Sequence, residues 1–365
     1  MKALKISKPP DDAMKDILRF LLEKKKVQAV FTLSKIEGNG YAYALISNKE
    51  LLSNICPTFP LMPVNSAKMI SRLTAVKAVE LPVVVVLRPC ELRALFELVK
   101  LEQVKLDNLL FVSFVCCGVF PIKTMKDALD GKVEKYWENV RLGEDLEELR
   151  ESCRICENFV PDNADIVLIT GGSQNNKASS VLMKTEKGEE FLKGLNDQFM
   201  EEDVELEGLD NVRNRRVELK KTVFSDLKTE DFGIQGLTRI FGRCINCHAC
   251  SKACPICYCN LCHFEAGESE SNPSTFEVDL NNRGALRLPT NTVFYHVGRL
   301  IHVTISCVGC GMCSDVCPTD IPVATVFTKI AEHVQNSFNY VPGRNVEEKI
   351  PILTFELEEL QELGE

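Results

Sequence analysis

The sequence predicts an N-terminal α/β domain followed by a smaller, cysteine-rich α+β domain. Residues 81–88 are centred on a run of β-branched residues, residues 91–101 have helical periodicity, and residues 109–115 are again apolar. A strand, a helix and a strand in that order favour parallel pairing within one open sheet. Beyond Gly233 the composition shifts sharply towards cysteine, and we place the domain boundary there.

Other segments extend the predicted sheet. Apolar residues between 14 and 22 lie on one helical face, and residues 27–33 follow as a strand. Residues 165–170 and 180–183 are predicted as two strands around a loop, with a helix from Glu186 to about Phe199 after them. The expected divisions are residues 1–200 for the α/β domain, 201–232 for a charged connecting segment, 233–338 for the cysteine-rich domain and 339–365 for a polar, acidic tail.

Composition and charge limit the possible function classes. The chain has 365 residues, of which 45% are apolar, and a net charge of −9 with both signs spread along it. This balance gives no reason to expect a nucleic-acid partner. No apolar run approaches the length that crosses a bilayer, and no signal peptide is visible in residues 1–12. We therefore expect a cytoplasmic protein that is not integral to a membrane.

The cysteine content points to metal binding. Seventeen cysteines, an odd number in a chain without a visible export signal, argue against a disulfide framework. Two copies of C-x2-C-x2-C-x3-C-P begin at Cys244 and Cys307, and this doubled motif is typical of ferredoxins with two 4Fe–4S clusters. Zinc also binds C-x2-C pairs, but as two pairs for each ion rather than as a run of four. Because the fourth cysteine of each copy ligates the other cluster, the predicted ligands are Cys244, Cys247, Cys250 and Cys317 for one cluster, and Cys307, Cys310, Cys313 and Cys254 for its partner.

Three further cysteines, Cys257, Cys259 and Cys262, lie between the two copies. They either ligate a further metal or are spare thiols that shield the first cluster. The second interpretation is favoured, since no fourth partner follows at a recognised spacing. His248 lies within a cluster loop, where a role outside the ligand set is favoured.

Cysteines are also scattered through the N-terminal domain. Cys90 ends one predicted strand, Cys116 and Cys117 end the next, and the pair Cys153 and Cys156 precedes a third. Because strand carboxyl ends in an open α/β sheet meet at one edge, four of these thiols could come together there. Each cysteine alone is more often an inert core residue. Together with their C-x2-C pair, however, they predict a third cluster.

The standard nucleotide-binding fingerprints are missing from the sequence. It contains no G-x-G-x-x-G after a strand and no phosphate-binding P-loop. Gly171-Gly172-Ser173 offers a backbone that a cofactor could approach closely. An ordinary turn between two strands accounts for the same residues equally well.

These motifs together resemble the beta subunits of coenzyme F420-dependent hydrogenases and dehydrogenases and, more closely, the beta subunit of formate dehydrogenase. The resemblance covers nearly the whole chain. The residues that carry it are Arg88-Pro89-Cys90, Val115-Cys116 with Pro121, Cys153-Arg154-Ile155-Cys156, Ala164-Asp165-Ile166, the run from Cys254 to Cys262, Asp320-Ile321-Pro322 and Tyr340-Val341-Pro342-Gly343. It implies an N-terminal α/β domain of this beta-subunit type, followed by a two-cluster ferredoxin-like α+β domain.

The resemblance also implies a chemistry. Members of this family contain FAD, exchange a hydride with the deazaflavin coenzyme F420 and pass single electrons through clusters to a partner. The resemblance implies that the Gly171-Gly172 loop approaches the cofactor and that Cys116, rather than Cys117, is a ligand. The four cysteines that it implies as ligands of a third 4Fe–4S cluster beside the flavin are Cys90, Cys116, Cys153 and Cys156.

The expected partner subunits are inferred from the catalytic cofactor motifs that the chain lacks. It has no visible molybdopterin or nickel–iron signature, so the oxidation of formate or hydrogen would take place on another subunit. The expected partners are a catalytic dehydrogenase or hydrogenase subunit, a heterodisulfide-reductase-like subunit and a soluble electron carrier.

Two alternatives stand beside this function. The family usually opens its first helix with a Gly-Gly pair, whereas this chain has Asp11-Asp12-Ala13-Met14-Lys15 there. Acidic and bulky residues crowd or repel a phosphorylated cofactor. This departure favours an iron–sulfur wire without flavin, which links a catalytic subunit to a heterodisulfide-reductase-like or other redox partner. In the second alternative, the same pocket takes NAD(P)H.

Overall fold

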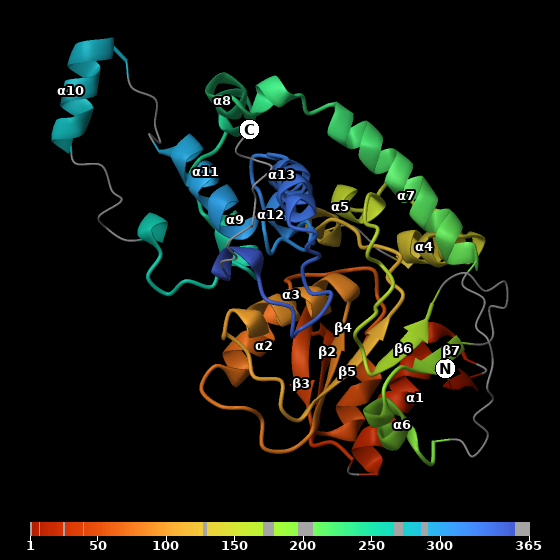
Figure 1. The fold of residues 1–365 in the computed structure, drawn as a ribbon. Coiled ribbons are helices and arrows are strands. Elements are labelled where there is room, and N and C mark those ends of the chain that lie inside the picture. The colour runs from red at the N-terminus through yellow and green to blue at the C-terminus, as the bar shows by residue number, and fades with distance from the viewer. Residues whose placement is uncertain are drawn as a thin grey trace.

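A single mixed sheet of seven strands forms the N-terminal half of the chain (Figure 1). Its order is β1-β7-β6-β5-β4-β2-β3; the central strands β2, β4, β5 and β6 are parallel, and β3, β7 and β1 run antiparallel to their neighbours. The strands are β1 (Lys2–Ile6), β2 (Ala29–Ile36), β3 (Gly40–Ile46), β4 (Val83–Leu87), β5 (Leu109–Phe114), β6 (Ile166–Ile169) and β7 (Ser179–Met183). The computed structural model describes residues 2–6, 8–24, 26–38, 40–126, 130–170, 179–195, 207–265, 273–285 and 291–354.

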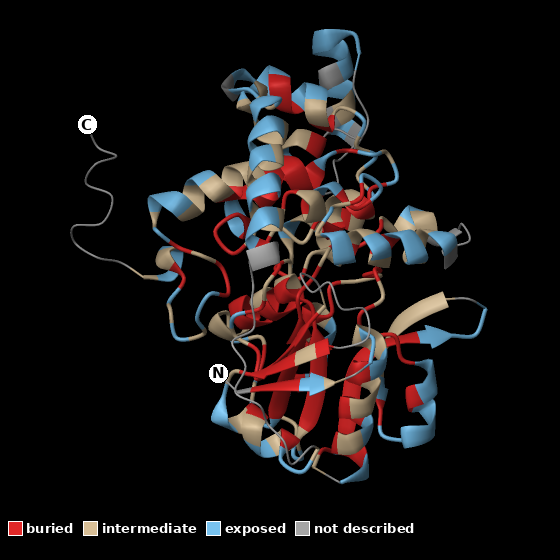
Figure 2. Ribbon diagram, turned by 90° about the vertical axis from the view of Figure 1, so that its right-hand side faces the viewer, coloured by how far each residue is buried: buried red, intermediate tan, exposed pale blue. Residues whose placement is uncertain are grey.

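Helices cover both faces of the sheet because its central strands are apolar on both sides. Strand β4 is buried along its whole length. Val84 and Val86 face α1 (Pro10–Glu23) and α6 (Glu186–Leu192). The alternate residues of β4 face α2 (Ala67–Thr74) and α3 (Pro89–Lys100) on the other side. Figure 2 shows the buried residues concentrated in the sheet and on the sides of the helices that face it.

The C-terminal part of the chain is helical and packs against the carboxyl edge of the sheet (Figure 1). Phe241, Val326 and Phe327 are buried in a core of its own. The long helix α7 (Glu207–Ser225) runs along the side of the molecule between the two parts. The helices after it are α8 (Ile234–Phe241), α9 (Ala249–Ala253), α10 (Pro273–Arg283), α11 (Thr292–Val303), α12 (Met312–Asp315) and α13 (Val323–Ser337). Within the described residues, none of the helices is long and apolar enough to span a bilayer.

The predicted strand–helix–strand unit is confirmed as β4, α3 and β5, with Val83 opposite Leu109 in a parallel register. Helix α3 begins at Pro89, whose fixed φ suits the first turn of a helix. The strands predicted at residues 27–33, 165–170 and 180–183 correspond to β2, β6 and β7. Strands β1 and β3, which lie at the two ends of the sheet, were not predicted. In β1 lysines interrupt the apolar residues, whereas β3 is apolar from Tyr41 to Ile46 but only half-buried over most of its length. Helix α6 ends at Leu192, and the last residues of the predicted helix lie outside the described residues.

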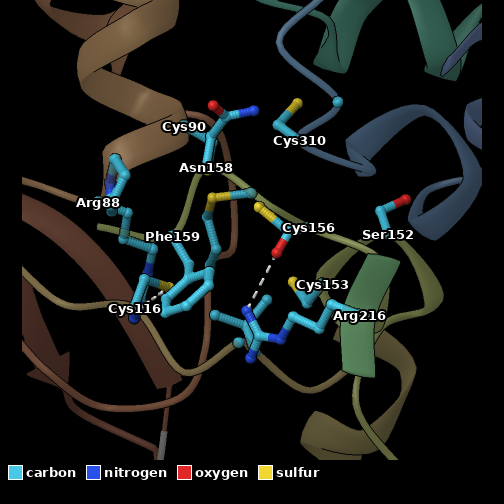
Figure 3. Close-up of a pocket in the computed structure, with 15 residues that line it drawn as sticks. Arg88, Cys90, Cys116, Ser152, Cys153, Cys156, Asn158, Phe159, Arg216 and Cys310 are labelled. Carbon is cyan, nitrogen blue, oxygen red and sulfur yellow. Dashed lines mark hydrogen bonds between the residues drawn. The ribbon is translucent and has the colours of Figure 1, made fainter. Parts of the chain in front are cut away.

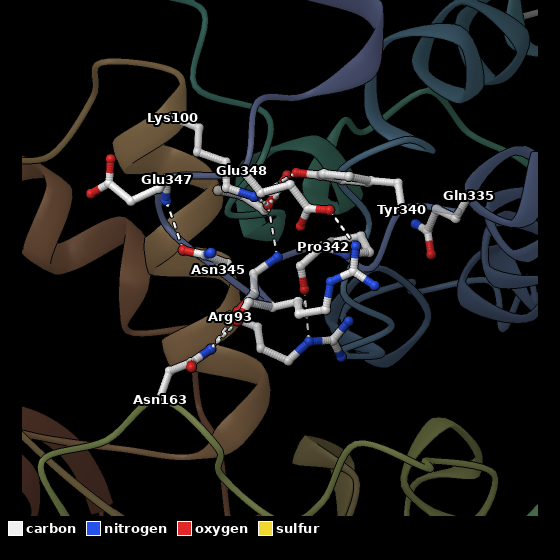
Figure 4. A network of polar contacts seen from close by, with 12 residues as sticks. Arg93, Lys100, Asn163, Gln335, Tyr340, Pro342, Asn345, Glu347 and Glu348 are labelled. Carbon is white, nitrogen blue, oxygen red and sulfur yellow. Dashed lines mark hydrogen bonds and ion pairs between the residues drawn. The ribbon is translucent and has the colours of Figure 1, made fainter. Parts of the chain in front are cut away.

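After α13 the chain returns to the α/β domain and docks on α3 (Figure 4). The buried carboxylate of Glu97 accepts hydrogen bonds from the Tyr340 hydroxyl at 2.7 Å and from the Gly343 amide at 2.7 Å. Arg93 Nε donates to the Pro342 carbonyl at 2.8 Å. The first part of the predicted C-terminal tail is therefore fixed to the sheet domain by a buried charge and its hydrogen bonds.

Removal of the cation beside Glu97 is expected to destabilise the protein. Lys100 Nζ lies 3.0 Å from the Glu97 carboxylate, and their side chains are 4% and 0% exposed. Lys100→Met leaves this buried carboxylate without its counter-ion, which costs about 3–5 kcal/mol of unfolding free energy. The expected result is a lower midpoint of thermal unfolding, measured by circular dichroism.

Lys77→Met is the matched control, because Lys77 and Glu80 form an ion pair with the same three-residue spacing at the surface. Exposed pairs contribute little to stability, so the midpoint of this variant should hardly change. Similar losses in the two variants would contradict the role given to Glu97 and Lys100.

Candidate iron–sulfur centres

Four cysteines of the α/β domain meet at the carboxyl edge of the sheet. Cys90 lies in the first turn of α3, directly after β4, and Cys116 follows β5. Cys153 and Cys156 come from α5 (Glu151–Arg154) and the residues just after it. All four line one small pocket, and Figure 3 shows them around it. We name these four cysteines the third set; they converge because parallel strands end at a common edge.

Cys117 takes a different position from its neighbour Cys116. Successive side chains of an extended segment point to opposite sides. The Cys117 side chain accordingly packs against the cluster of buried residues that includes Phe120 and, on α4 (Asp130–Leu142), Tyr136. The structure brings Cys116, and not Cys117, into the space shared with Cys90.

Buried arginines surround the third set. Arg88 Nη1 lies 3.6 Å from Cys116 Sγ. Arg216 reaches the same space from α7, is 1% exposed and donates to the Cys156 carbonyl at 3.4 Å. It also pairs with Asp145 at 2.6 Å. These cations match the negative charge that four thiolates bring into a poorly hydrated site.

Burial makes two thiols of the third set reluctant to ionise without a metal. Loss of hydration raises the pKa of the Cys153 thiol to about 11 and that of Cys90 well above its usual value. These two thiols are therefore protonated at neutral pH, and binding of a metal at this place would release their protons.

The two ferredoxin motifs repeat in backbone conformation as well as in sequence. Asn246 and His248 stand before and after the second cysteine of the first copy, with φ of 55° and 56°. Gly309 and Gly311 stand at the same positions of the second copy, with φ of 69° and 77°. These left-handed residues turn the chain tightly around the space that its cysteines enclose, and glycine adopts this conformation with least strain.

The structure brings together the two groups of cysteines that the motif predicts. Helices α9 and α12, one from each motif, pack against each other, so the last cysteine of each copy reaches the other copy. The first set comprises Cys244 and three thiols that lie close enough to raise its pKa electrostatically, namely Cys247, Cys250 and Cys317. The second set comprises Cys254, Cys307, Cys310 and Cys313, which line a common cavity.

Side chains of α11 contact the sulfur atoms of the first set. Arg299 Nη1 donates to Cys250 Sγ at 3.0 Å. His296 Nε2 lies 3.4 Å from Cys244 Sγ. Burial lowers the pKa of His296 to about 3, so this ring is neutral at physiological pH. The sulfur atoms of the first set thus have both charged and neutral hydrogen-bond partners.

The second and third sets are neighbours across the boundary between the two parts of the chain. Cys310 lines the cavity of the second set and also that of the third. Arg150, directly before α5, donates to the Cys310 carbonyl at 3.0 Å and forms a buried ion pair with Asp315. This contact fixes the position of one set relative to the other.

The three additional cysteines have different environments. Cys257 lies beside Cys254, and the interaction between the two thiols lowers the pKa of Cys254. Cys259 is exposed, and Cys262 is half-buried. In the described parts of the chain, no three His, Cys, Asp or Glu side chains are grouped as ligands of a single metal ion.

Two segments were expected to affect flavin binding, and the structure describes one of them. Gly171, Gly172 and Ser173 lie outside the described residues. The acidic segment that stands in place of the family's Gly-Gly pair forms the first turn of α1. Its Asp11 carboxylate accepts hydrogen bonds from the Thr58 hydroxyl at 3.0 Å and from the Thr58 amide at 3.3 Å.

Sequence reasoning missed the arginines that contact the cysteines. Arg299 is the single cation of an otherwise mostly apolar helix, which is a usable signal for a buried charge. Arg216 carries no such signal, because α7 is rich in charged residues that lie at the surface. Only its contacts with Asp145 and with carbonyls of the α/β domain distinguish it.

Comparison with known proteins agrees with the cysteine pattern. Residues 138–210 match the family described as the C terminus of the beta subunit of coenzyme F420 hydrogenase/dehydrogenase. Residues 303–323 match the 4Fe-4S binding domain. The chain is related to these beta subunits. The resemblance that the sequence predicts is confirmed, and so is a ferredoxin-type domain at the C-terminal end.

Curated relatives match over most of their length. The F420-dependent formate dehydrogenase subunit beta of Methanocaldococcus jannaschii is 26% identical, over 93% of this chain and 93% of its own. The F420-dependent formate dehydrogenase 1 subunit beta of Methanococcus maripaludis is 26% identical, over 91% of this chain and 90% of its own. A chain from the F420-reducing [NiFe] hydrogenase complex of Methanosarcina barkeri matches with a TM-score of 0.45 and 18% identity, over 64% of this chain and 93% of that chain.

The close approach of the second motif to the α/β domain gives a test at Gly311. Its φ is +77°, and a Cβ there would lie 2.7 Å from both Arg150 Cδ and Ser152 Oγ. Gly311→Ala is expected to lose about 1–2 kcal/mol from the left-handed backbone, and more from this overlap. Its midpoint of thermal unfolding should fall clearly.

Gly194→Ala separates the cost of the left-handed backbone from the cost of the overlap. Gly194 also has a positive φ, of +89°, but nothing lies within 4 Å of a Cβ placed there. We therefore expect Gly194→Ala to lower the midpoint less than Gly311→Ala. A larger loss at Gly194 would show that the motif does not press against residues 150–152.

Proposed function

We propose that this chain is the electron-transfer subunit of an oxidoreductase related to F420-dependent formate dehydrogenase, with three 4Fe–4S clusters in series. The proposal is carried by one observation: the second and third sets share Cys310 as a lining residue, while the first and second sets exchange their fourth cysteines. The three sets are thus consecutive neighbours. A 4Fe–4S cluster supplies one-electron transfer, and three neighbouring clusters make a path for single electrons.

The residues present fit such clusters. Each set offers four thiols, and buried guanidinium groups lie beside the sulfur atoms, as with Arg88 at Cys116 and Arg299 at Cys250. In this proposal the thiolates bind iron, and the arginines offset the negative charge. Apolar residues such as Met312, which is buried among these cysteines, exclude water. The exclusion of water strengthens each of these electrostatic contacts.

The proposal extends to a two-electron carrier and a partner. Clusters do not accept hydride, so FAD would supply hydride exchange with the deazaflavin that the names of the relatives indicate. The expected catalytic partner is the subunit that oxidises the primary substrate, and a heterodisulfide-reductase-like subunit is a further partner in this proposal.

A wire without flavin is the second candidate function. The acidic first turn of α1 favours it, because Asp11 is held in place by Thr58 and by an ion pair with Lys15 at 3.0 Å. A phosphorylated cofactor at this turn would meet a fixed negative charge. In this candidate, the three sets conduct electrons between a catalytic subunit and another redox subunit.

The iron content tests the three-cluster proposal. Anaerobically purified protein should contain about twelve irons and as many acid-labile sulfides. Cys153→Ser should lose about four irons, because it removes one thiolate of the third set. Cys117→Ser is the matched control and should keep all of them, since Cys117 does not line the cavity. About eight irons in the native protein would rule out the third cluster.

Flavin content separates the two candidate functions. Native protein with about one FAD per chain and reduction by the deazaflavin would support hydride exchange. About twelve irons without flavin would support the wire. Full activity towards the primary substrate in the isolated chain would contradict the expected catalytic partner in both cases.

A further inference from the structure

Three polar side chains within about one turn of α11 lie against the sulfur atoms of the first set. They are Tyr295, His296 and Arg299, and all three are buried. The Tyr295 hydroxyl lies 3.5 Å from Cys250 Sγ, and His296 Nε2 lies 3.4 Å from Cys244 Sγ. Arg299 Nη1 donates to Cys250 Sγ at 3.0 Å. One helix therefore supplies three hydrogen-bonding groups to two cysteines of a single set.

Arg299 also brings a full positive charge to the first set. Its Nη2 donates to the Cys250 carbonyl at 3.2 Å, so one cysteine residue accepts from both ends of the guanidinium fork. Among the residues that the structure describes, no Asp or Glu forms an ion pair with Arg299. A buried guanidinium keeps its charge and needs a counter-charge. Arg299 lines the cavity of the second set as well, but the sulfur atom to which it donates belongs to the first.

Two cations that approach the second set contact its backbone and not its sulfur atoms. Arg150 donates to the Cys310 carbonyl at 3.0 Å, and a buried ion pair with Asp315 already balances its charge. Lys68 Nζ donates to the Cys254 carbonyl at 3.3 Å. A charge at a carbonyl lies farther from the cluster than one that donates directly to a ligating sulfur. The electrostatic support of negative charge is therefore stronger at the first set.

The ring of His296 acts as a hydrogen-bond donor in a protein that contains the cluster. A neutral imidazole has one N–H, and a thiolate that ligates iron has no proton to donate. Nε2 therefore carries the proton and donates to Cys244 Sγ, while Nδ1 is buried without a partner among the described residues. The ring is stacked on Phe241, with centroids 3.9 Å apart. By the same reasoning the Tyr295 hydroxyl donates to Cys250 Sγ.

We propose that α11 makes the first cluster the more easily reduced member of the C-terminal pair, through Arg299 above all and through His296 and Tyr295 to a smaller extent. Net charge and hydrogen bonds to the sulfur atoms help to set the potential of a 4Fe–4S cluster. Reduction adds one negative charge, which the guanidinium and the two neutral donors stabilise. An electron that enters the pair therefore settles at the first cluster. This inference rests on the proposed function, because it requires clusters at both sets.

Redox titration of the anaerobic protein, followed by electron paramagnetic resonance, tests this order of potentials. In the native protein the first cluster should be reduced at the higher potential of the pair. Cys244→Ser, which replaces one of its ligands, identifies its signal. Arg299→Met should keep about twelve irons and make the first cluster about tenfold harder to reduce, a fall of about 59 mV for one electron. The potential of the second cluster should fall by less.

His296→Phe and Tyr295→Phe each remove one donor and keep an aromatic ring. Each should lower the potential of the first cluster by less than Arg299→Met does, because a neutral hydrogen bond is weaker than a charged one. His302→Phe is the matched control for His296→Phe and should leave both potentials unchanged, since His302 lies on the same helix but is exposed. These two variants also decide the question if Arg299→Met does not retain its iron.

Three results would overturn the inference. The first is a lower potential at the first cluster than at the second in the native protein. The second is an unchanged first cluster in Arg299→Met or, where that variant loses iron, in both His296→Phe and Tyr295→Phe. The third is a larger fall at the second cluster than at the first in Arg299→Met. Native protein without iron at the two ferredoxin motifs would instead refute the proposed function itself, so the two failures are distinguishable.

Discussion

Burial of thiolates beside arginine is the interaction on which the rest of this structure depends. Twelve cysteines are gathered into three sets, and all of them except Cys247 are buried or half-buried, where negative charge is costly unless it is balanced. Arg88, Arg216 and Arg299 are each no more than 3% exposed and each lies beside such a set. Their guanidinium groups cannot lose their charge. The positions of the helices that contain or follow these arginines are therefore tied to the positions of the sulfur atoms.

This requirement explains how the two parts of the chain are joined. The cysteines at the carboxyl edge of the sheet have to be shielded from water. The second ferredoxin motif packs over them, and its Cys310 lines their pocket. Arg150 and Asp315 close the contact with a buried ion pair across the boundary. Lys68 makes a further contact across the boundary, because it donates to the carbonyls of Lys252 and Cys254 in the first motif and to that of Cys257 just after it. The two parts of the chain therefore meet in a contact that contains a buried ion pair and several hydrogen bonds.

Local patterns predicted a large part of this arrangement. The doubled motif predicts both the ferredoxin sets and the exchange of Cys254 and Cys317, because its spacing reflects how one loop encloses a cluster. The β-branched run at β4 predicts the parallel unit, and with it the edge at which Cys90 and Cys116 meet. The choice of Cys116 over Cys117 came only from the family resemblance, since the residues alone leave both possible.

Other features depend on partners far along the chain and could not be predicted from local patterns. Glu97 looks like an ordinary helical residue until Tyr340 and Gly343 return to it from more than 240 positions away. Arg216 is similar, because its neighbours on α7 are also charged, and Asp145 and two carbonyls alone select it for burial. Buried charges of this kind are set by tertiary contacts, and neither composition nor periodicity encodes them.

Exposure to solvent differs between the two ends of the proposed path. Among the twelve cysteines of the three sets, Cys247 of the first set is the exposed one, and Ile245 in the same loop is 56% exposed. The third set lies at the opposite end, enclosed between the sheet edge, α7 and the second motif. Solvent near a cluster stabilises its more negative, reduced state, whereas an apolar enclosure disfavours it. In the proposed path, hydration therefore favours the reduced state at the first set more than at the third.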